Sequence, residues 1–284
     1  MPTSRPLTSL LAVAMLAIAT PSHAFDPSSV PNAEGSPREV LRYGYNALKN
    51  GHVDDAVEAF SWGAEHKNVA AQWKLARMKQ TADGVARDEI GALALYRTIV
   101  SRFDGVMPGR YELPFVSSAT VALGQYALNG LPEANMNANP DIAESYFYRA
   151  AALYQDAEAQ YRLGSLYLSG TLGTVRATSA ARWLGLSARK GHPYAQAELG
   201  HMLVEGKRVR RQMVRGLVLL AQAGSQTDTP QVHVWRDTAF AAASKTDRVR
   251  ARKILNALSE TQPMVNTDGV PVSDAPAQPT AVNK

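Results

Sequence analysis

The chain of 284 residues contains no cysteine. This absence excludes disulfide bonds, thiolate zinc sites and a cysteine nucleophile. It also excludes the lipoprotein type of membrane anchor, which is attached through an acylated cysteine. The folded state must therefore be held together by packing, and the 45% of residues that are hydrophobic provide enough material for one extended core.

Long apolar runs are also absent, apart from one near the N-terminus. Residues 10–19 read LLAVAMLAIA, Arg5 is the only charge before them, and the small-residue pattern PSHA follows and ends at Ala24. Ten residues make only about 15 Å of helix, against roughly 30 Å of hydrocarbon, which favours a secretory signal over a membrane anchor. We expect a signal peptide at 1–24, cleavage before Phe25, a periplasmic protein, and no stable membrane insertion after cleavage.

Recognised catalytic and metal-binding motifs are missing as well. The six histidines form no H-E-x-x-H pattern and have no partner at metal-ligand spacing. The segment GHMLVEGKR departs from a phosphate-binding loop, because five residues separate its glycines and Arg208 replaces the Ser or Thr that binds magnesium. Asp54 and Asp55 are adjacent, but they open a predicted helix, where they stabilise the positive end of its dipole. We predict no enzyme, no cofactor and no metal site.

What the sequence does contain is a repeated pattern. AQYRLGSLYLSG at 159–170 recurs as AQAELGHMLVEG at 195–206, and weaker copies begin at Ala119 and Ala71. The first alanines lie 48, 40 and 36 residues apart, which is typical of stacked-repeat proteins. Each copy has a second half, such as AARWLGLSARKG at 180–191, whose apolar residues recur three and four positions apart as on a helix face.

Each repeat is therefore predicted to be two antiparallel helices joined by a turn that contains glycine. Small residues would lie where the helices cross, and large residues would fill the space beside the crossing. Glycine inside a helix costs about 1 kcal/mol relative to alanine, so its recurrence indicates that packing compensates for this cost. The predicted structural positions are Leu75, Leu123, Gly124, Leu163, Gly164, Trp183, Leu199 and Gly200.

Helix-start signals place the boundaries. Ser36, Asn139 and Thr229 each stand before a proline, as N-cap residues do. Strand patterns are nearly absent. The sequence predicts an all-α fold, a right-handed α-solenoid of about five TPR-like helix pairs followed by a C-terminal capping helix. The expected order is a leader at 25–36, the solenoid at 37–225, the capping helix at 226–258 and a disordered tail at 259–284.

The formal net charge of +5 is a mild excess that selects no class of partner. The most basic segment is KRVRRQMVR, which contains Lys207, Arg208, Arg210 and Arg211. These residues would form either a docking patch for an acidic partner loop or an anionic polysaccharide, or a solvated turn between two helices. We expect no nucleic-acid partner, because the protein is predicted to lie outside the cytoplasm.

A two-helix unit with A-x-x-x-L-G early and A-x-x-W-x-x-x-[SA]-A-x-x-G late resembles the Sel1-like repeat family. The match is good for 159–191 and 195–224, fair for 119–154 and 71–100, and weak for 38–67. Because these repeats are interaction scaffolds, the resemblance implies binding to another molecule without identifying it.

A closer resemblance covers most of the chain. The segments DDAVEA at 54–59, WKLARM at 73–78, DGV at 83–85, LPEANMNANP at 131–140 and KGH at 190–192 follow one another in an order similar to the ExoR family of periplasmic negative regulators of exopolysaccharide production. The resemblance implies binding to the periplasmic domain of a sensor histidine kinase, so that an ExoS–ChvI type two-component system is held off. It also implies relief of inhibition by a periplasmic protease. The alternative is a periplasmic accessory protein or a carbohydrate-binding protein of polysaccharide assembly.

Overall fold

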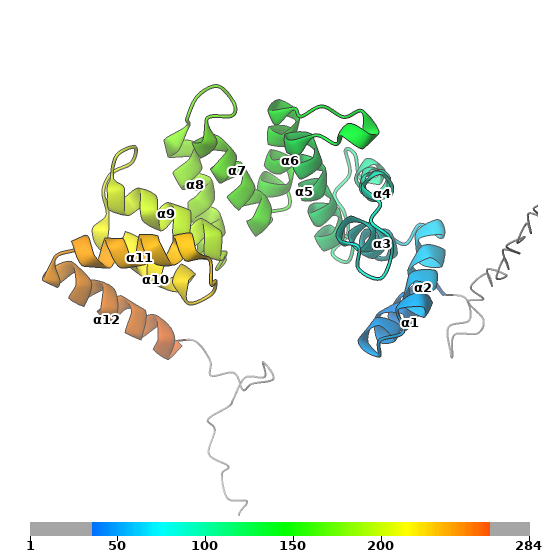
Figure 1. Ribbon diagram of the computed structural model, residues 1–284, viewed down its shortest axis with the longest axis horizontal. Coiled ribbons are helices and arrows are strands. Elements are labelled where there is room, and N and C mark those ends of the chain that lie inside the picture. Colours follow the sequence, from blue (N-terminus) through cyan, green and yellow to red (C-terminus); the bar gives the residue numbers. More distant parts are fainter. Residues whose placement is uncertain (1–35, 262–284) are drawn as a thin grey trace, which may run out of the picture. The chain divides into compact units, whose positions relative to one another are not determined.

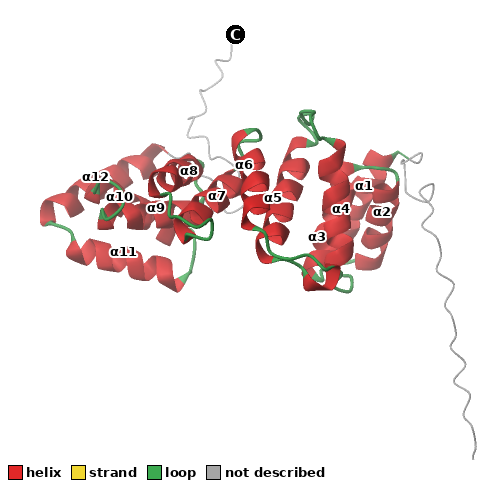
Figure 2. Cartoon of the chain, turned by 90° about the horizontal axis from the view of Figure 1, so that it is seen from above, coloured by secondary structure: helices red, strands yellow, loops and turns green. Residues whose placement is uncertain are grey.

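The computed structural model describes residues 36–261. The predicted signal peptide with its cleavage site, the leader up to residue 35, and residues 262–284 of the predicted tail lie outside the described residues. The described part consists of twelve α-helices and one short 3-10 helix, and no β-strand occurs in it (Figures 1 and 2). The all-α class predicted from the sequence is confirmed.

The helices follow one another in pairs along the chain, and the predicted succession of about five helix pairs is confirmed. The pairs are α1 (Pro37–Lys49) with α2 (Val53–Glu65), α3 (Val69–Thr81) with α4 (Glu89–Arg102), α5 (Leu113–Asn129) with α6 (Pro140–Ala152), α7 (Ala157–Ser169) with α8 (Ala177–Arg189), and α9 (Pro193–Glu205) with α10 (Met213–Gly224). Two further helices follow, α11 (Pro230–Ala242) and α12 (Lys245–Thr261).

The chain divides into two compact units after Asn68. The first contains α1 and α2, whose contact buries Val40 and Ala59 beneath the partly buried rings of Tyr43 and Trp62. The second contains α3 to α12, in which consecutive pairs share continuous apolar clusters. Each unit thus has a core of its own, made of the small and large apolar residues that recur along the helices.

The three helix starts predicted from the sequence are confirmed, but only one of them has a side-chain capping bond. Asn139 is the N-cap of α6, and its side-chain oxygen accepts a hydrogen bond of 3.0 Å from the backbone N–H of Ile142. Ser36 and Thr229 also stand at N-cap positions, but neither side chain makes the capping bond. In these two helices the proline at the first helical position, whose fixed φ suits a helix, remains as the local start signal.

The glycine at the end of the two best-matching patterns, 159–170 and 195–206, ends a helix. Gly170 follows α7 with φ of 76°, and Gly206 follows α9 with φ of 69°, both in the left-handed region. An L-residue with a side chain is strained in this conformation, whereas glycine is not. The backbone conformation of the turn after the first helix therefore explains why glycine stands at the last position of both patterns.

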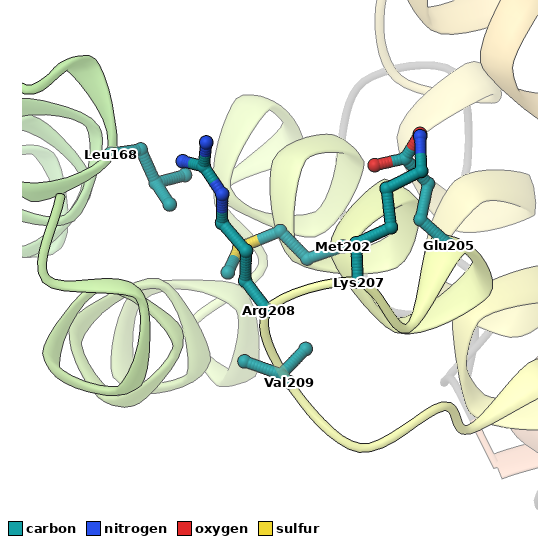
Figure 3. Close-up of a pocket in the computed structure, with 6 residues that line it drawn as sticks. All are labelled: Leu168, Met202, Glu205, Lys207, Arg208 and Val209. Atoms are coloured by element: carbon teal, nitrogen blue, oxygen red, sulfur yellow. The ribbon is translucent and has the colours of Figure 1, made fainter.

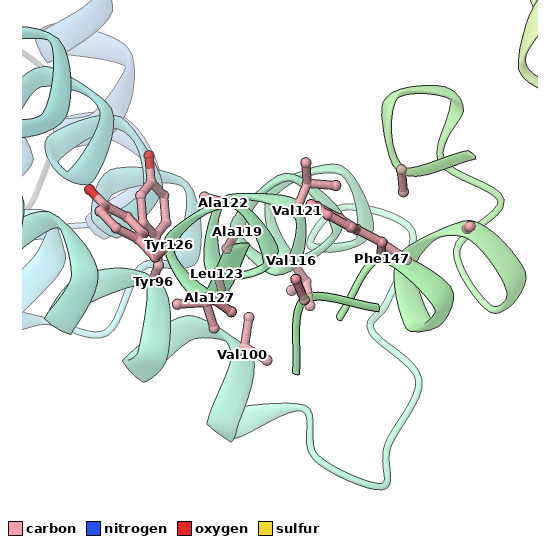
Figure 4. Packing of buried hydrophobic residues seen from close by; sticks show 14 of the residues in the cluster. Tyr96, Val100, Val116, Ala119, Val121, Ala122, Leu123, Tyr126, Ala127 and Phe147 are labelled. Atoms are coloured by element: carbon pink, nitrogen blue, oxygen red, sulfur yellow. The ribbon is translucent and has the colours of Figure 1, made fainter. Parts of the chain in front are cut away.

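The largest core cluster lies in the second unit, around α5. Figure 4 shows buried side chains of α5, such as Leu123, between Tyr96 of α4 and Phe147 of α6. Tyr96 is 1% exposed and Phe147 is fully buried. Removal of such large apolar side chains from water is the main source of stability in a protein without disulfides.

The prediction of a single C-terminal capping helix is wrong, because the structure has two helices in its place, α11 and α12. Ala243 between them has an extended backbone, and the Ser244 hydroxyl oxygen accepts a hydrogen bond of 3.1 Å from the backbone N–H of Asp247. Arg248 in turn donates to the Ala243 carbonyl at the end of α11. Ser244 thus acts as the N-cap that starts a new helix, and α12 continues to Thr261, beyond the predicted boundary.

None of the helices between residues 36 and 261 has the length and hydropathy that crossing a bilayer would require.

Candidate functional site

The repeat positions predicted from the sequence lie at the crossings of the paired helices. The core contains Leu75, Leu123, Leu163 and Leu199, which are at most 8% exposed. A methyl group on Gly124 would come within 2.5 Å of the Phe147 ring, and one on Gly200 within 2.9 Å of Leu220 Cγ. The glycines are therefore needed because the second helix of each pair places a large side chain directly against the first. These residues build the scaffold and are not themselves a binding site.

Trp183 packs against the largest core cluster without entering it. It is only partly buried, and its ring lies edge-on to that of Tyr148, with 6.0 Å between the ring centroids. The neighbouring residue Leu184 is fully buried and fills the space against Gly164. Trp183 and Leu184 are about 100° apart around α8. The direction from which α7 approaches α8 therefore decides which of the two side chains enters the core.

The four predicted partner-binding residues lie in the loop between α9 and α10. Lys207, Arg208, Arg210 and Arg211 are all exposed. Lys207 forms an ion pair of 3.0 Å with Glu205, and this hydrogen bond lowers the pKa of the Glu205 carboxyl. No carboxylate of the described residues pairs with the other three arginines within 4 Å. The loop therefore presents free guanidinium groups to solvent.

Part of this loop forms a pocket of about 310 Å³. Its lining residues are Leu168, Met202, Glu205, Lys207, Arg208 and Val209 (Figure 3). Figure 3 shows Arg208 extending over Met202 toward Leu168, while Lys207 turns toward Glu205. Apolar side chains below charged groups suit the recognition of a protein side chain. Arg210 and Arg211 do not line this pocket.

A second group of side chains, between α7 and α9, was not predicted. The Tyr161 ring stacks on the His192 ring with centroids 4.6 Å apart, and the exposed Tyr194 lies beside both. His192 Nδ1 accepts a hydrogen bond from the Ala195 backbone N–H and caps α9. The proton must then be on Nε2, which donates to Glu158 over 2.8 Å. His192 in the KGH segment is thus a structural residue.

Glu198 on α9 is the most buried carboxylate of this group. It accepts hydrogen bonds from the Ser165 hydroxyl at 2.8 Å and the Tyr161 hydroxyl at 3.3 Å, both on α7. Burial disfavours its charge and raises the pKa of the Glu198 carboxyl. A carboxylate with a raised pKa is also a feature of catalytic sites, but here its oxygens are already occupied by partners within the protein.

The same kind of bond recurs between other helix pairs. Tyr167 of α7 donates to Glu144 of α6 over 2.7 Å, and Tyr126 of α5 donates to Glu89 of α4. Burial, together with the Glu144 carboxylate, raises the pKa of Tyr167 to about 12. Tyrosine–glutamate hydrogen bonds therefore connect neighbouring pairs at three places, which assigns these polar groups a structural role. The partners are 23 and 37 residues apart in sequence, so no short motif indicates them.

Two further observations bear on chemistry. Among the described residues, no group of three or more His, Asp or Glu side chains could hold a metal ion. His201 stacks on Trp235 of α11 with centroids 4.4 Å apart, and burial lowers the pKa of its imidazole. The histidine is thereby kept neutral in a contact between α9 and α11.

Comparison with known proteins agrees with the repeat architecture. The Sel1 repeat model matches residues 69–98, 117–154, 157–192 and 193–228. These four segments correspond to the pairs from α3/α4 to α9/α10. A crystal structure of a Sel1 repeat protein from Oxalobacter formigenes superposes with a TM-score of 0.59 at 20% identity, over 75% of this chain and 91% of that one. This likeness supports the fold.

Two curated relatives match most of the chain. One from Rhizobium meliloti (strain 1021) is 31% identical over 233 residues, which are 81% of this chain and 85% of the relative. One from Rhizobium leguminosarum bv. viciae is 29% identical over 247 residues, which are 86% of this chain and 90% of the relative. Both are described as exopolysaccharide production negative regulators.

Proposed function

The chain belongs to the Sel1-repeat family of exopolysaccharide production negative regulators, and from this we propose that it represses exopolysaccharide production by binding another protein. The observation that carries the proposal is the 31% identity that extends over 85% of a relative with this description. Stacked helix pairs offer an extended surface for a macromolecular partner. The partnered carboxylates of the α7–α9 group favour binding over catalysis.

The proposed partner is the periplasmic domain of a sensor histidine kinase of the ExoS–ChvI type. Support comes from the order of sequence segments that the chain shares with the ExoR family and from the predicted signal peptide. A scaffold can hold a kinase in one state only if it binds that state more tightly than the other. Destruction of the scaffold by a periplasmic protease would then release the kinase.

Gene deletion tests the regulatory function. We expect deletion to increase exopolysaccharide output, and we expect no increase in a strain that also lacks the cognate response regulator. Unchanged polysaccharide and kinase output after deletion would refute the regulator proposal. An increase that persists without the response regulator would place the protein in a different regulatory route. Purified protein and kinase sensor domain would show by calorimetry whether they bind directly.

The loop between α9 and α10 is the proposed contact. Arg208→Glu with Arg211→Glu reverses two exposed charges that have no carboxylate partner, so folding should be unaffected. Binding to the kinase domain should weaken, most of all at low salt, where charges are least screened. The matched control is Arg97→Glu with Arg110→Glu, which makes the same charge change at exposed positions far from the loop in sequence. Equal affinities of both double variants would remove the loop from the interface.

A carbohydrate-binding role is the second candidate, and the exposed Tyr194 beside Tyr161 favours it, since aromatic rings stack on sugar rings. Addition of exopolysaccharide fragments to the purified protein tests this role through tryptophan and tyrosine fluorescence. Binding that Tyr194→Ala abolishes would support the candidate. Absence of binding at millimolar fragment would count against it.

A further inference from the structure

Positive charge is concentrated in the last part of the described chain. Residues 206–261 contain eleven lysines and arginines but only four aspartates and glutamates, an excess of seven positive charges. Residues 36–205 contain seventeen of each and are formally neutral. The mild charge of the whole chain therefore conceals a strongly basic segment, formed by the α9–α10 loop and the helices α10 to α12.

An apolar groove lies within this basic segment, between α10 and α12. Its volume is about 450 Å³, and its lining residues are Gln212, Met213, Val214, Arg215, Val218, Asp247 and Ile254. Val218 is buried, whereas Ile254 is 43% exposed although it is a large apolar residue. Leu258, one helical turn further along α12, is 40% exposed. The groove thus presents aliphatic side chains of considerable area to solvent.

The start of α10 adds positive potential at the same place. Gln212 is its N-cap and makes no side-chain capping bond, and the first turn contains no acidic residue. Arg210, Arg211 and Arg215 stand around this end instead. The N-terminus of a helix carries partial positive charge, which acidic residues stabilise and basic residues oppose. The three arginines therefore destabilise this end of α10 electrostatically, and they would favour the binding of a negatively charged group beside it.

We propose that the groove between α10 and α12 binds an acidic amphipathic helix of the partner protein, with its apolar face on Met213, Val214 and Ile254 and its carboxylates toward Arg211, Arg215 and Arg250. Arg250 is one helical turn before Ile254 and therefore lies on the same side of α12. The inference rests on the proposed function in one respect, namely that the protein acts by binding a partner. It adds the site and the chemistry of the ligand.

Charge and shape together select this occupant. An anionic bilayer would also be attracted to the basic segment, but interfacial membrane binding needs a protruding apolar face. Here the apolar side chains line a concave surface, which accepts side chains from a helix, as in helix-in-groove recognition. Val249 is 59% exposed, but it lies about 140° around α12 from Ile254 and therefore on another face of the helix.

A synthetic peptide tests the groove without the kinase. The probe is a labelled, helix-forming peptide of about two heptads, with leucines at helical spacing on one face and glutamates on the other. We expect the full-length protein to bind it, and Ile254→Glu to weaken binding at least about tenfold because a carboxylate would stand on the apolar face. Val249→Glu is the matched control, since it makes the same change on α12 about 140° away, and should weaken binding less than about threefold.

Several outcomes would overturn the inference. Equal effects of Ile254→Glu and Val249→Glu on peptide binding would do so, and so would the absence of peptide binding. Binding to phosphatidylglycerol vesicles but not to the peptide would indicate a membrane-binding surface instead. Should Ile254→Glu change the melting temperature, Arg215→Glu replaces it, and its effect on peptide binding should disappear at high salt. Kinase-domain binding that Ile254→Glu leaves unchanged would reject the groove but keep the proposed function. Peptide binding without kinase-domain binding would keep the groove but reject the proposed function.

Discussion

Leu184 of α8 lies directly against Gly164 of α7, so closely that a methyl group on the glycine would come within 2.7 Å of Leu184 Cγ and 3.2 Å of its backbone nitrogen. Leu184 is fully buried. The contact between Gly200 and Leu220 repeats this relationship in the next helix pair, and the two partners are again twenty positions apart in sequence. The repeat is thus defined by a close contact between the two helices as much as by its apolar pattern.

Gly164→Ala should destabilise the protein by about 1–2 kcal/mol, because overpacking of the contact with Leu184 outweighs the gain in helix propensity. Gly185→Ala is the control inside α8, since a methyl group there would meet its nearest atom only at 3.8 Å. It should stabilise the protein by about 0.5–1 kcal/mol. Urea unfolding measures both, and a stabilising Gly164→Ala would contradict the close contact.

Leu163→Ala should cost about 2–5 kcal/mol, because it removes a fully buried side chain and leaves a cavity. Leu153, which is 58% exposed at the end of α6, provides the control, and Leu153→Ala should change stability by less than about 0.5 kcal/mol. Thermal unfolding followed by circular dichroism distinguishes them. Leu163→Asp should have a still larger effect, since it buries an unpaired charge.

Glu198 should make stability depend on pH. Its pKa is raised in the folded state, so the folded protein binds a proton more tightly than the unfolded chain, and the associated stability is lost as pH rises above the ordinary glutamate value of 4.5. Glu198→Gln mimics the protonated form and should raise the melting temperature at pH 7. This advantage should shrink as the pH approaches 4. An equal gain at both pH values would exclude titration as its cause.

Glu158 should behave in the opposite way. Burial would raise the pKa of this carboxyl, but the hydrogen bond from His192 and the charge of Arg162 outweigh burial and lower it. Its contribution to stability is therefore present at neutral pH and is lost as pH falls below 4.5 through the lowered value. Glu158→Gln should reduce the melting temperature at pH 7 and have little effect at the lowest pH at which the protein stays folded.

Export gives a further prediction. The protein should be recovered from the periplasm with Phe25 as its first residue, since the small-residue pattern before Phe25 suits signal peptidase. N-terminal sequencing and cell fractionation test this. Replacement of Ala24 by a bulky residue, as in Ala24→Leu, should accumulate uncleaved precursor, whereas His23→Leu should not. Recovery of the intact N-terminus from wild-type cells would reject the predicted cleavage.

The sequence predicted those parts of the fold that local patterns determine. The spacing of alanine, leucine and glycine located the helix pairs because each pair is a local structure whose core positions recur with helical periodicity. The break between α11 and α12 was overlooked although the N-cap residue Ser244 is a local signal, because the alanine-rich stretch before it continues the helical pattern. Whether Leu184 or Trp183 packs against Gly164 depends on the direction from which α7 approaches α8, and the sequence does not show this direction.

The candidate binding surfaces were less accessible to prediction. The exposed basic loop could be located because charge is visible in sequence, but the groove beside it could not. Met213 and Ile254, which line that groove, are 41 residues apart, and their partial exposure is a property of the packed helices. The bond between Tyr161 and Glu198 likewise joins residues from different repeats, which no periodic pattern brings together.

The tyrosine–glutamate hydrogen bonds between helix pairs have a mechanical consequence. Within a pair, close packing at the glycines holds the two helices together, and any separation of the helices would expose this packed contact to water. Between pairs, part of the connection consists of single hydrogen bonds, which water can replace one at a time. Under a pulling force the second unit should therefore lengthen in discrete steps of one helix pair each. A partner that spans two neighbouring pairs would stiffen the joint between them.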